Sequence, residues 1–224
     1  VGVASIQGVS SPSAFFFTHA RELDWRGEPG RHQALRNMDI WPGHLENGND
    51  LSAEITLTGK ERDDGEAFMR SLAGGAPRVI VYHPGAGKAP NRWPAENFAR
   101  LAGRLSASGA AVITAGPMDD EPVAAMTRDM QTPHRIIRNQ PIRRVASALR
   151  FADLVISNDT GIMHVAAAVG TPVLSLFGPT DPRQWAPAGP QHRYIRGEGE
   201  DITTIRIDTV AEAAHEMLRR GSTR

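Results

Sequence analysis

Short apolar runs alternate with longer amphipathic segments from residue 78 to the end of the chain. The apolar runs predict buried strands at 79–82, 110–115, 134–137, 154–157 and 173–177. The intervening segments have apolar residues at helical spacing and predict helices at 94–107, 122–130, 142–150, 162–169 and 208–220. This alternation indicates an α/β fold: a parallel sheet with helices on both faces, which binds ligands at the carboxyl ends of its strands.

The first 75 residues carry weaker signals. Apolar runs predict strands at 15–18 and 55–57, and helices are predicted at 31–38 and from 60 toward 72. A Gly-Gly-Ala-Pro cluster at 74–77 interrupts the last helix just before the strand at 79–82. We therefore place a domain boundary there, which divides the chain into residues 1–75 and residues 76–224.

Composition excludes several classes of protein. Lys plus Arg and Asp plus Glu both number 25, so the formal charge is zero, which argues against a general nucleic-acid binder. The chain has no cysteine, and its eight histidines are scattered without the spacing of a zinc site, so we expect no metal. No apolar run approaches the roughly 20 residues that a membrane-spanning helix needs.

A polar loop separates the predicted strand at 154–157 from an alanine-rich helix. The loop ends in Asp159, Thr160 and Gly161, and either Asp159 or Thr160 is suited to cap the helix. The N–H groups at a helix N-terminus attract phosphate, and His164 lies about one turn into the same helix. A buried, capped helix whose histidine makes a core hydrogen bond is the alternative interpretation.

A second candidate loop follows the strand at 79–82. Ala86 stands between Gly85 and Gly87, so the backbone can approach a diphosphate closely, and Lys88 and Arg92 can neutralise its charge. A tight strand-to-helix turn explains the glycines equally well. The combination of both loops favours a binding site.

These motifs together resemble glycosyltransferase family 9, the ADP-heptose:lipopolysaccharide heptosyltransferases. The resemblance rests on Tyr82-His-Pro-Gly-Ala-Gly87, Asn91-Arg-Trp-Pro94, the turn at 115–121 and the segment at 155–180, in the family's order. It implies a GT-B type fold, with residues 76–224 as its Rossmann-like nucleotide-sugar-binding domain. It also implies an inverting, metal-independent transfer without a cofactor.

The resemblance assigns roles to particular residues. It places the sugar and diphosphate of the donor at Asp159, Thr160, Gly161 and His164, and the ribose of the nucleotide at Glu121. In the family a lysine commonly stands two residues before the tryptophan, where this chain has Asn91. The complete set of expected substrate-binding residues is Ala86, Gly87, Lys88, Asn91, Arg92, Glu121, Asp159, Thr160, Gly161 and His164.

The family also suggests what lies outside the donor site. Residues 1–75 are expected to be a remnant of an incomplete N-terminal, acceptor-side domain, so the catalytic base belongs to a missing part and the chain alone should transfer no sugar. The expected partners are a nucleotide-diphosphate sugar, with ADP-heptose suspected, and a glycan or glycolipid acceptor such as lipopolysaccharide core. The expected location is the cytoplasm, at the inner face of the cytoplasmic membrane, with peripheral membrane association through the missing part.

Two other functions fit the same residues. A nucleotide-sugar-binding module without catalysis would use the same loops, and a sugar-nucleotide epimerase shares the two-domain architecture. Transfer needs an acceptor, epimerisation needs only the donor, and a binding module converts neither.

Overall fold

The computed structural model describes residues 7–9, 19–21, 30–38, 51–128 and 130–221. The chain forms two compact units. One comprises Val1–Leu51 with Asp181–Trp185, and the other comprises Ser52–Thr180 with Ala186–Arg224.

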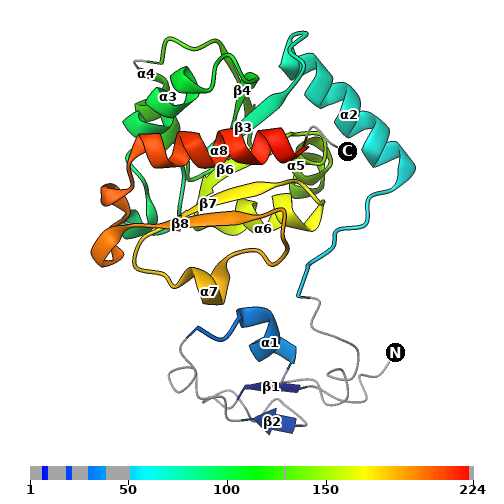
Figure 1. Cartoon of the computed structure of the whole chain (residues 1–224). Helices are drawn as coiled ribbons and strands as arrows, with labels where there is room; N and C mark the ends of the chain where they lie inside the picture. Colours follow the sequence, from blue (N-terminus) through cyan, green and yellow to red (C-terminus); the bar gives the residue numbers. More distant parts are fainter. Residues whose placement is uncertain (1–6, 10–18, 22–29, 39–50, 129, 222–224) are drawn as a thin grey trace. The chain divides into compact units, whose positions relative to one another are not determined.

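The larger unit is built on one six-stranded sheet in which every neighbouring pair of strands is parallel (Figure 1). Its strands are β3 (Val79–His83), β4 (Ala110–Ala115), β5 (His134–Arg138), β6 (Leu154–Asn158), β7 (Val173–Phe177) and β8 (Arg193–Arg196). They are arranged in the order β5-β4-β3-β6-β7-β8, which is the 3-2-1-4-5-6 order of the Rossmann fold. The predicted parallel α/β sheet is therefore confirmed.

Helices cover both faces of this sheet. They are α2 (Gly59–Ala73), α3 (Ala95–Arg104), α4 (Asp120–Arg128), α5 (Ile142–Leu149), α6 (Gly161–Ala168) and α8 (Ile207–Gly221). The apolar sides of α3, α4 and α8 form one core with alternate strand residues such as Ile80, Tyr82 and Ile156. On the other face, α5 contacts both α2 and α6. Alternate residues of a strand point to opposite faces, so strands that are buried throughout pack against the helices on both faces of the sheet.

The smaller unit contains a parallel pair of short strands, β1 (Gln7–Val9) and β2 (His19–Arg21), and two short helices, α1 (Gln33–Met38) and α7 (Pro182–Trp185). Within it, the side chain of Gln184 on α7 donates to that of Gln33 on α1 at 3.4 Å. The strand predicted at 15–18 lies outside the described residues. Among the helices of the described part, none has the length and hydrophobicity that crossing a bilayer requires.

The strand predicted at 55–57 is wrong. Residues 51–58 have no regular secondary structure, and the amide of Ile55 donates to the carbonyl of Ala168 instead of joining a sheet. The segment leads into α2, whose first turn is closed by a capping box between Thr58 and Glu61. Helix α2 belongs to the larger unit, while the division of the chain at residue 75 into acceptor-side and donor-side domains stays a prediction.

Helix α2 lies against α5 so closely that Gly65 leaves no room for a side chain. A Cβ atom at this position would stand 2.3 Å from the carbonyl oxygen of Ser147. We expect Gly65→Ala to lower the free energy of unfolding by about 1–3 kcal/mol, because the two helices must move apart. Urea denaturation followed by circular dichroism measures the change. Gly59→Ala in the same helix is the matched control, because a Cβ there meets no atom within 4 Å; equal stability losses in the two variants would contradict the prediction.

Candidate functional site

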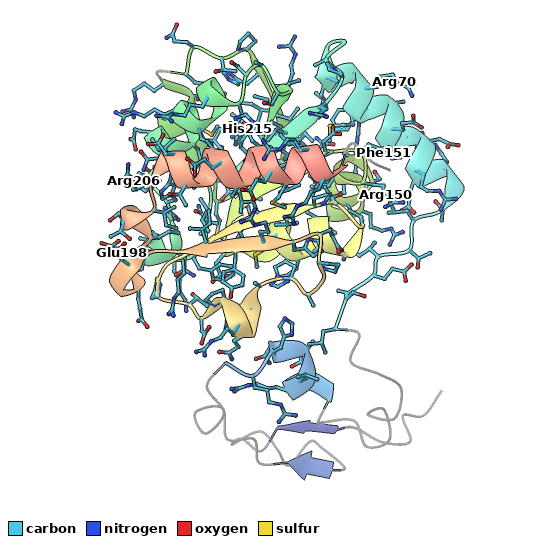
Figure 2. The ribbon with its side chains drawn as sticks, in the orientation of Figure 1. Arg70, Arg150, Phe151, Glu198, Arg206 and His215 are labelled. Carbon is cyan, nitrogen blue, oxygen red and sulfur yellow. The ribbon has the colours of Figure 1, made fainter. Side chains whose placement is uncertain are left out.

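The candidate site lies where the strand order of the sheet reverses. β3 and β6 are neighbours, and the helices that follow them, α3 and α6, lead to strands on opposite sides of the pair. The carboxyl edge between these two strands, here called the crevice, is the usual ligand position in open α/β sheets. In Figure 2, Glu198, which follows β8, marks this edge, whereas Arg150 and Phe151, which precede β6, mark the opposite one.

Asn158, the last residue of β6, holds the loops together. Its side chain is fully buried and donates through Nδ2 to the carbonyls of Pro84, at 2.8 Å, and Gly85, at 3.3 Å. Its Oδ1 accepts from the backbone N–H of Trp93 at 3.0 Å. One amide thus fixes both the turn after β3 and the start of α3, and satisfies buried backbone groups that no strand or helix pairs.

An open cavity of about 570 Å³ lies beside these loops. Its walls come from the ends of β3, β4 and β5, the turn at 116–119 and the first residues of α5 and α6. Exposed Met118 and Ile142 make part of the wall apolar. The lining residues are His83, Ala86, Gly87, Arg92, 114–119, Ile137, Gln140, Ile142, Val145, 160–162 and Val165. A cavity of this size with few polar groups is typical of small-molecule sites.

A His–Asp pair lines the cavity, with His83 buried and Asp119 half-buried. Nδ1 of His83 lies 3.1 Å from both the carbonyl and the hydroxyl oxygen of Thr114, and Nε2 lies 3.8 Å from Oδ2 of Asp119. Burial lowers the pKa of His83, although Asp119 and the Thr114 carbonyl act in the opposite direction. Asp119 also accepts from the backbone N–H of Gly116 at 2.7 Å, so it closes the turn after β4.

Asp159 belongs to a second group of side chains next to the crevice. The side chain of Asn91 donates to Oδ2 of Asp159 and to the hydroxyl of Thr180, each at 3.1 Å. Burial raises the pKa of Asp159, while a hydrogen bond from Thr180 and the charges of His164 and Lys88 lower it. The carboxyl group is therefore surrounded by donors and positive charge, although its desolvation has the largest effect.

Arg92 is engaged mainly with the loop that precedes it. Its Nε donates to the carbonyl of Ala86 at 2.8 Å, and its Nη1 lies 3.4 Å from Oε2 of Glu121. Glu121 is exposed on the first turn of α4, so this ion pair is weak. Arg92 thus shapes the turn at 86–87 and presents a guanidinium group at the cavity wall.

Helix α6 begins at Gly161, with Thr160 as its N-cap residue. The Thr160 side chain makes no capping hydrogen bond, and a Cβ at Gly161 would meet no atom within 4 Å. Both residues line the cavity. The start of α6 therefore lies at the cavity, where an anion is favoured by the helix dipole.

The expected site residues fall into two neighbouring groups. Ala86, Gly87, Arg92, Thr160 and Gly161 line the cavity, whereas Asn91, Lys88 and His164 interact with Asp159. Glu121 reaches the cavity only through Arg92. Asn158 was not among the residues predicted from the sequence. The feature that could have indicated its role is an amide side chain at the end of a buried strand.

Nothing in the described residues suggests a metal centre. Among them, no group of three or more His, Asp or Glu side chains is placed to hold a metal ion. Lys88, His164 and Arg92 supply positive charge at the crevice, which suits an anionic ligand, and the carboxyl groups of Asp119 and Asp159 lie beside them.

Comparison with known proteins identifies the family of this chain. The sequence model of glycosyltransferase family 9 (heptosyltransferase) matches residues 15–215. Lipooligosaccharide heptosyltransferase 2 of Haemophilus influenzae is 32% identical over 155 residues, which cover 66% of this chain and 44% of that protein. Lipopolysaccharide heptosyltransferase 2 of Salmonella typhimurium is 28% identical over 248 residues, with coverage of 91% and 71%.

Solved structures show the same fold. The crystal structure of a family 9 glycosyltransferase from Veillonella parvula superposes with a TM-score of 0.82 and 25% identity, over 97% of this chain and 68% of that chain. The ADP-heptose lps heptosyltransferase II of E. coli gives a TM-score of 0.64 and 26% identity, with coverage of 75% and 54%. This chain thus spans between 44% and 71% of the length of these four proteins.

Proposed function

The chain belongs to glycosyltransferase family 9, and we propose that it binds the nucleotide-sugar donor of a heptosyltransferase-like reaction. In that reaction a sugar passes from a nucleoside diphosphate to a cell-envelope glycan such as lipopolysaccharide core. The crevice between the loops after β3 and β6 carries this proposal. There, Asn91 joins Asp159 beside a cavity of about 570 Å³.

The geometry suggests how the donor is divided between the two groups of residues. The apolar wall of the cavity suits the nucleoside, and the first turn of α6 with Lys88 and Arg92 suits the diphosphate. Asp159 and His164 then face the sugar. All ten expected binding residues keep these roles as proposals, with Ala86 and Gly87 lending backbone contact and Glu121 lying nearest the ribose.

The chemistry assigned to this part of the protein is stabilisation of the leaving group. As the bond between sugar and diphosphate breaks, negative charge grows on the phosphate oxygens, and fixed dipoles and cations lower the barrier most when they are already in place. Lys88, Arg92 and the N–H groups of α6 are such groups. We assign no catalytic base among the described residues.

The names of the relatives suggest the substrates and the compartment. The E. coli structure is that of an ADP-heptose lps heptosyltransferase, so we propose ADP-heptose as the donor and lipopolysaccharide core as the acceptor. Nucleotide sugars of this kind imply a cytoplasmic location, at the inner face of the cytoplasmic membrane.

Product analysis tests the proposed function against its two rivals. We incubate the 224-residue chain with ADP-heptose, with and without a heptose-deficient lipopolysaccharide, and separate the products by mass spectrometry and chromatography. Binding of ADP-heptose without transfer is expected in both mixtures, because no catalytic base is assigned among the described residues. Epimerised donor without acceptor would support an epimerase. Transfer of the sugar to the acceptor would exclude a binding module and would place the acceptor-side chemistry in these 224 residues as well. A chain that binds neither ADP nor ADP-heptose would refute the proposal.

Lys88 is expected to contact the diphosphate. Its ammonium group is exposed, and its charge already reaches Asp159. Loss of a charge-assisted hydrogen bond of about 1.5 kcal/mol predicts that Lys88→Ala weakens ADP binding by roughly tenfold, as measured by calorimetry. Adenosine binding should stay unchanged, because the nucleoside carries no phosphate.

Lys60, the only other lysine of the chain, supplies the matched control. It pairs with Asp64 on the exposed surface of α2. Lys60→Ala therefore also removes one positive charge, but at a position distant in sequence from the crevice residues. Equal losses of ADP and adenosine affinity in Lys88→Ala would place the residue away from the phosphates.

A further inference from the structure

Asn91 lies at the meeting point of three loops. It ends the short 3₁₀ helix η2 (Ala89–Asn91) after β3, while Asp159 follows β6 and Thr180 follows β7. The Asn91 side chain is buried, with 9% of the residue exposed, and its Nδ2 donates to both partners at 3.1 Å. Both amide hydrogens therefore serve one purpose, which is to join Asp159 to Thr180.

The chemistry of an amide limits what Asn91 can do. It carries no charge and cannot neutralise a phosphate, unlike the lysine that the family commonly has here. Its two N–H donors are instead taken up by a carboxylate and a hydroxyl. A carboxylate has about four acceptor positions, so contacts with Asn91 and Thr180 leave others for hydroxyl groups of a ligand.

We propose that Asn91 is a positioning residue of the donor site, which holds Asp159 and Thr180 in the arrangement that receives the hydroxyl groups of the donor sugar. This inference rests on the proposed function for its ligand. It differs from a phosphate contact in a measurable way: Asn91 acts through Asp159 on the sugar, and its loss should leave the nucleoside diphosphate portion of binding almost unchanged.

Calorimetry with two ligands separates these roles. We titrate the 224-residue chain and its Asn91→Ala variant with ADP-heptose and with ADP. Asn91→Ala leaves Asp159 without this donor and should weaken ADP-heptose binding about tenfold, the equivalent of one hydrogen bond to a charged group, while ADP affinity changes by less than about threefold.

Asn91→Lys supplies donors again and should restore ADP-heptose binding. Asn97→Ala on α3 controls for loss of an amide outside the site. Equal losses for both ligands, or no loss for either, would overturn the proposal.

A ligand-free measurement keeps the inference testable by itself. A hydrogen bond to the charged form of a carboxyl group lowers its pKa, so removal of the Asn91 donor should raise the pKa of Asp159. Carbon-13 NMR titration of the Asp carboxyl signals in the chain and in Asn91→Ala measures this shift, with Lys88 and His164 unchanged around the group. If the pKa of Asp159 is the same in Asn91→Ala as in the parent chain, Asn91 is only a structural residue and the proposal is refuted.

The proposed function and the proposed role of Asn91 are refuted by different results. If the parent chain binds neither ADP nor ADP-heptose, the proposed function fails, whereas the NMR titration still decides whether Asn91 holds Asp159. If the parent chain binds both ligands and Asn91→Ala binds them equally well, the proposed function stands and the role of Asn91 is wrong.

Discussion

Replacement of Trp93 by alanine is expected to lower the free energy of unfolding by about 3–5 kcal/mol, a large part of the stability of an ordinary domain. Trp93 is 1% exposed and packs edge-to-face on Phe98 with ring centroids 5.1 Å apart. Its indole Nε1 donates to the carbonyl of Ile205 at 3.0 Å, which ties α3 to the segment before α8. Removal of the ring leaves both a cavity and an unpaired buried carbonyl.

Urea denaturation followed by circular dichroism measures this loss. Trp93→Phe separates its two causes, because it keeps most of the packing and removes only the donor to Ile205, with an expected loss of about 1–3 kcal/mol. Met118→Ala is the control: its side chain is 79% exposed, so its stability should change by less than about 0.5 kcal/mol. A Trp93→Ala variant as stable as Met118→Ala would show that this ring does not hold α3 in place.

The fold was largely predictable because its strands are buried on both faces. Strands such as β3 and β6 are buried throughout and begin with apolar runs, and such runs stand out between polar turns. β8 escaped prediction for the opposite reason. It is the last strand of the sheet, its sequence Arg-Tyr-Ile-Arg begins and ends with a charge, and edge strands commonly carry charges that discourage further pairing.

The strand predicted at 55–57 shows what a local pattern omits. Its alternation of apolar and polar residues suits a strand, but a strand also needs a neighbouring strand. Here the amide of Ile55 donates to Ala168 at the end of a helix, and the carbonyls of Thr56 and Leu57 accept from arginine side chains. The contacts of the candidate site likewise depend on more than the local sequence. The sequence placed Asp159 and Asn91 in separate loops, but their contact joins residues 68 positions apart and depends on the neighbouring positions of β3 and β6.

The expected loss of donor binding in Asp159→Ala is roughly 10-fold to 150-fold, equivalent to about 1.5–3 kcal/mol for a hydrogen bond to a charged group. We expect the carboxylate to accept from hydroxyl groups of the sugar while Asn91 and Thr180 hold it in place. Calorimetry with ADP-heptose measures the effect. Asp159→Asn keeps the shape of the side chain and removes its charge, so it distinguishes a requirement for the carboxylate from a requirement for packing.

The stability of an Asp159 variant should not fall together with its affinity for ADP-heptose. Weaker binding without a loss of stability identifies Asp159 as a binding residue. Burial raises the pKa of Asp159 in the folded protein, so the folded state holds this proton more tightly than the unfolded chain does. The contribution of Asp159 to stability is then present at low pH and is lost as the pH rises from the ordinary carboxyl range through the raised value. At pH 7 the charged group disfavours folding, and Asp159→Asn should be at least as stable as the parent chain while it binds ADP-heptose more weakly. A variant that loses stability and affinity together at pH 7 would instead make Asp159 a structural residue.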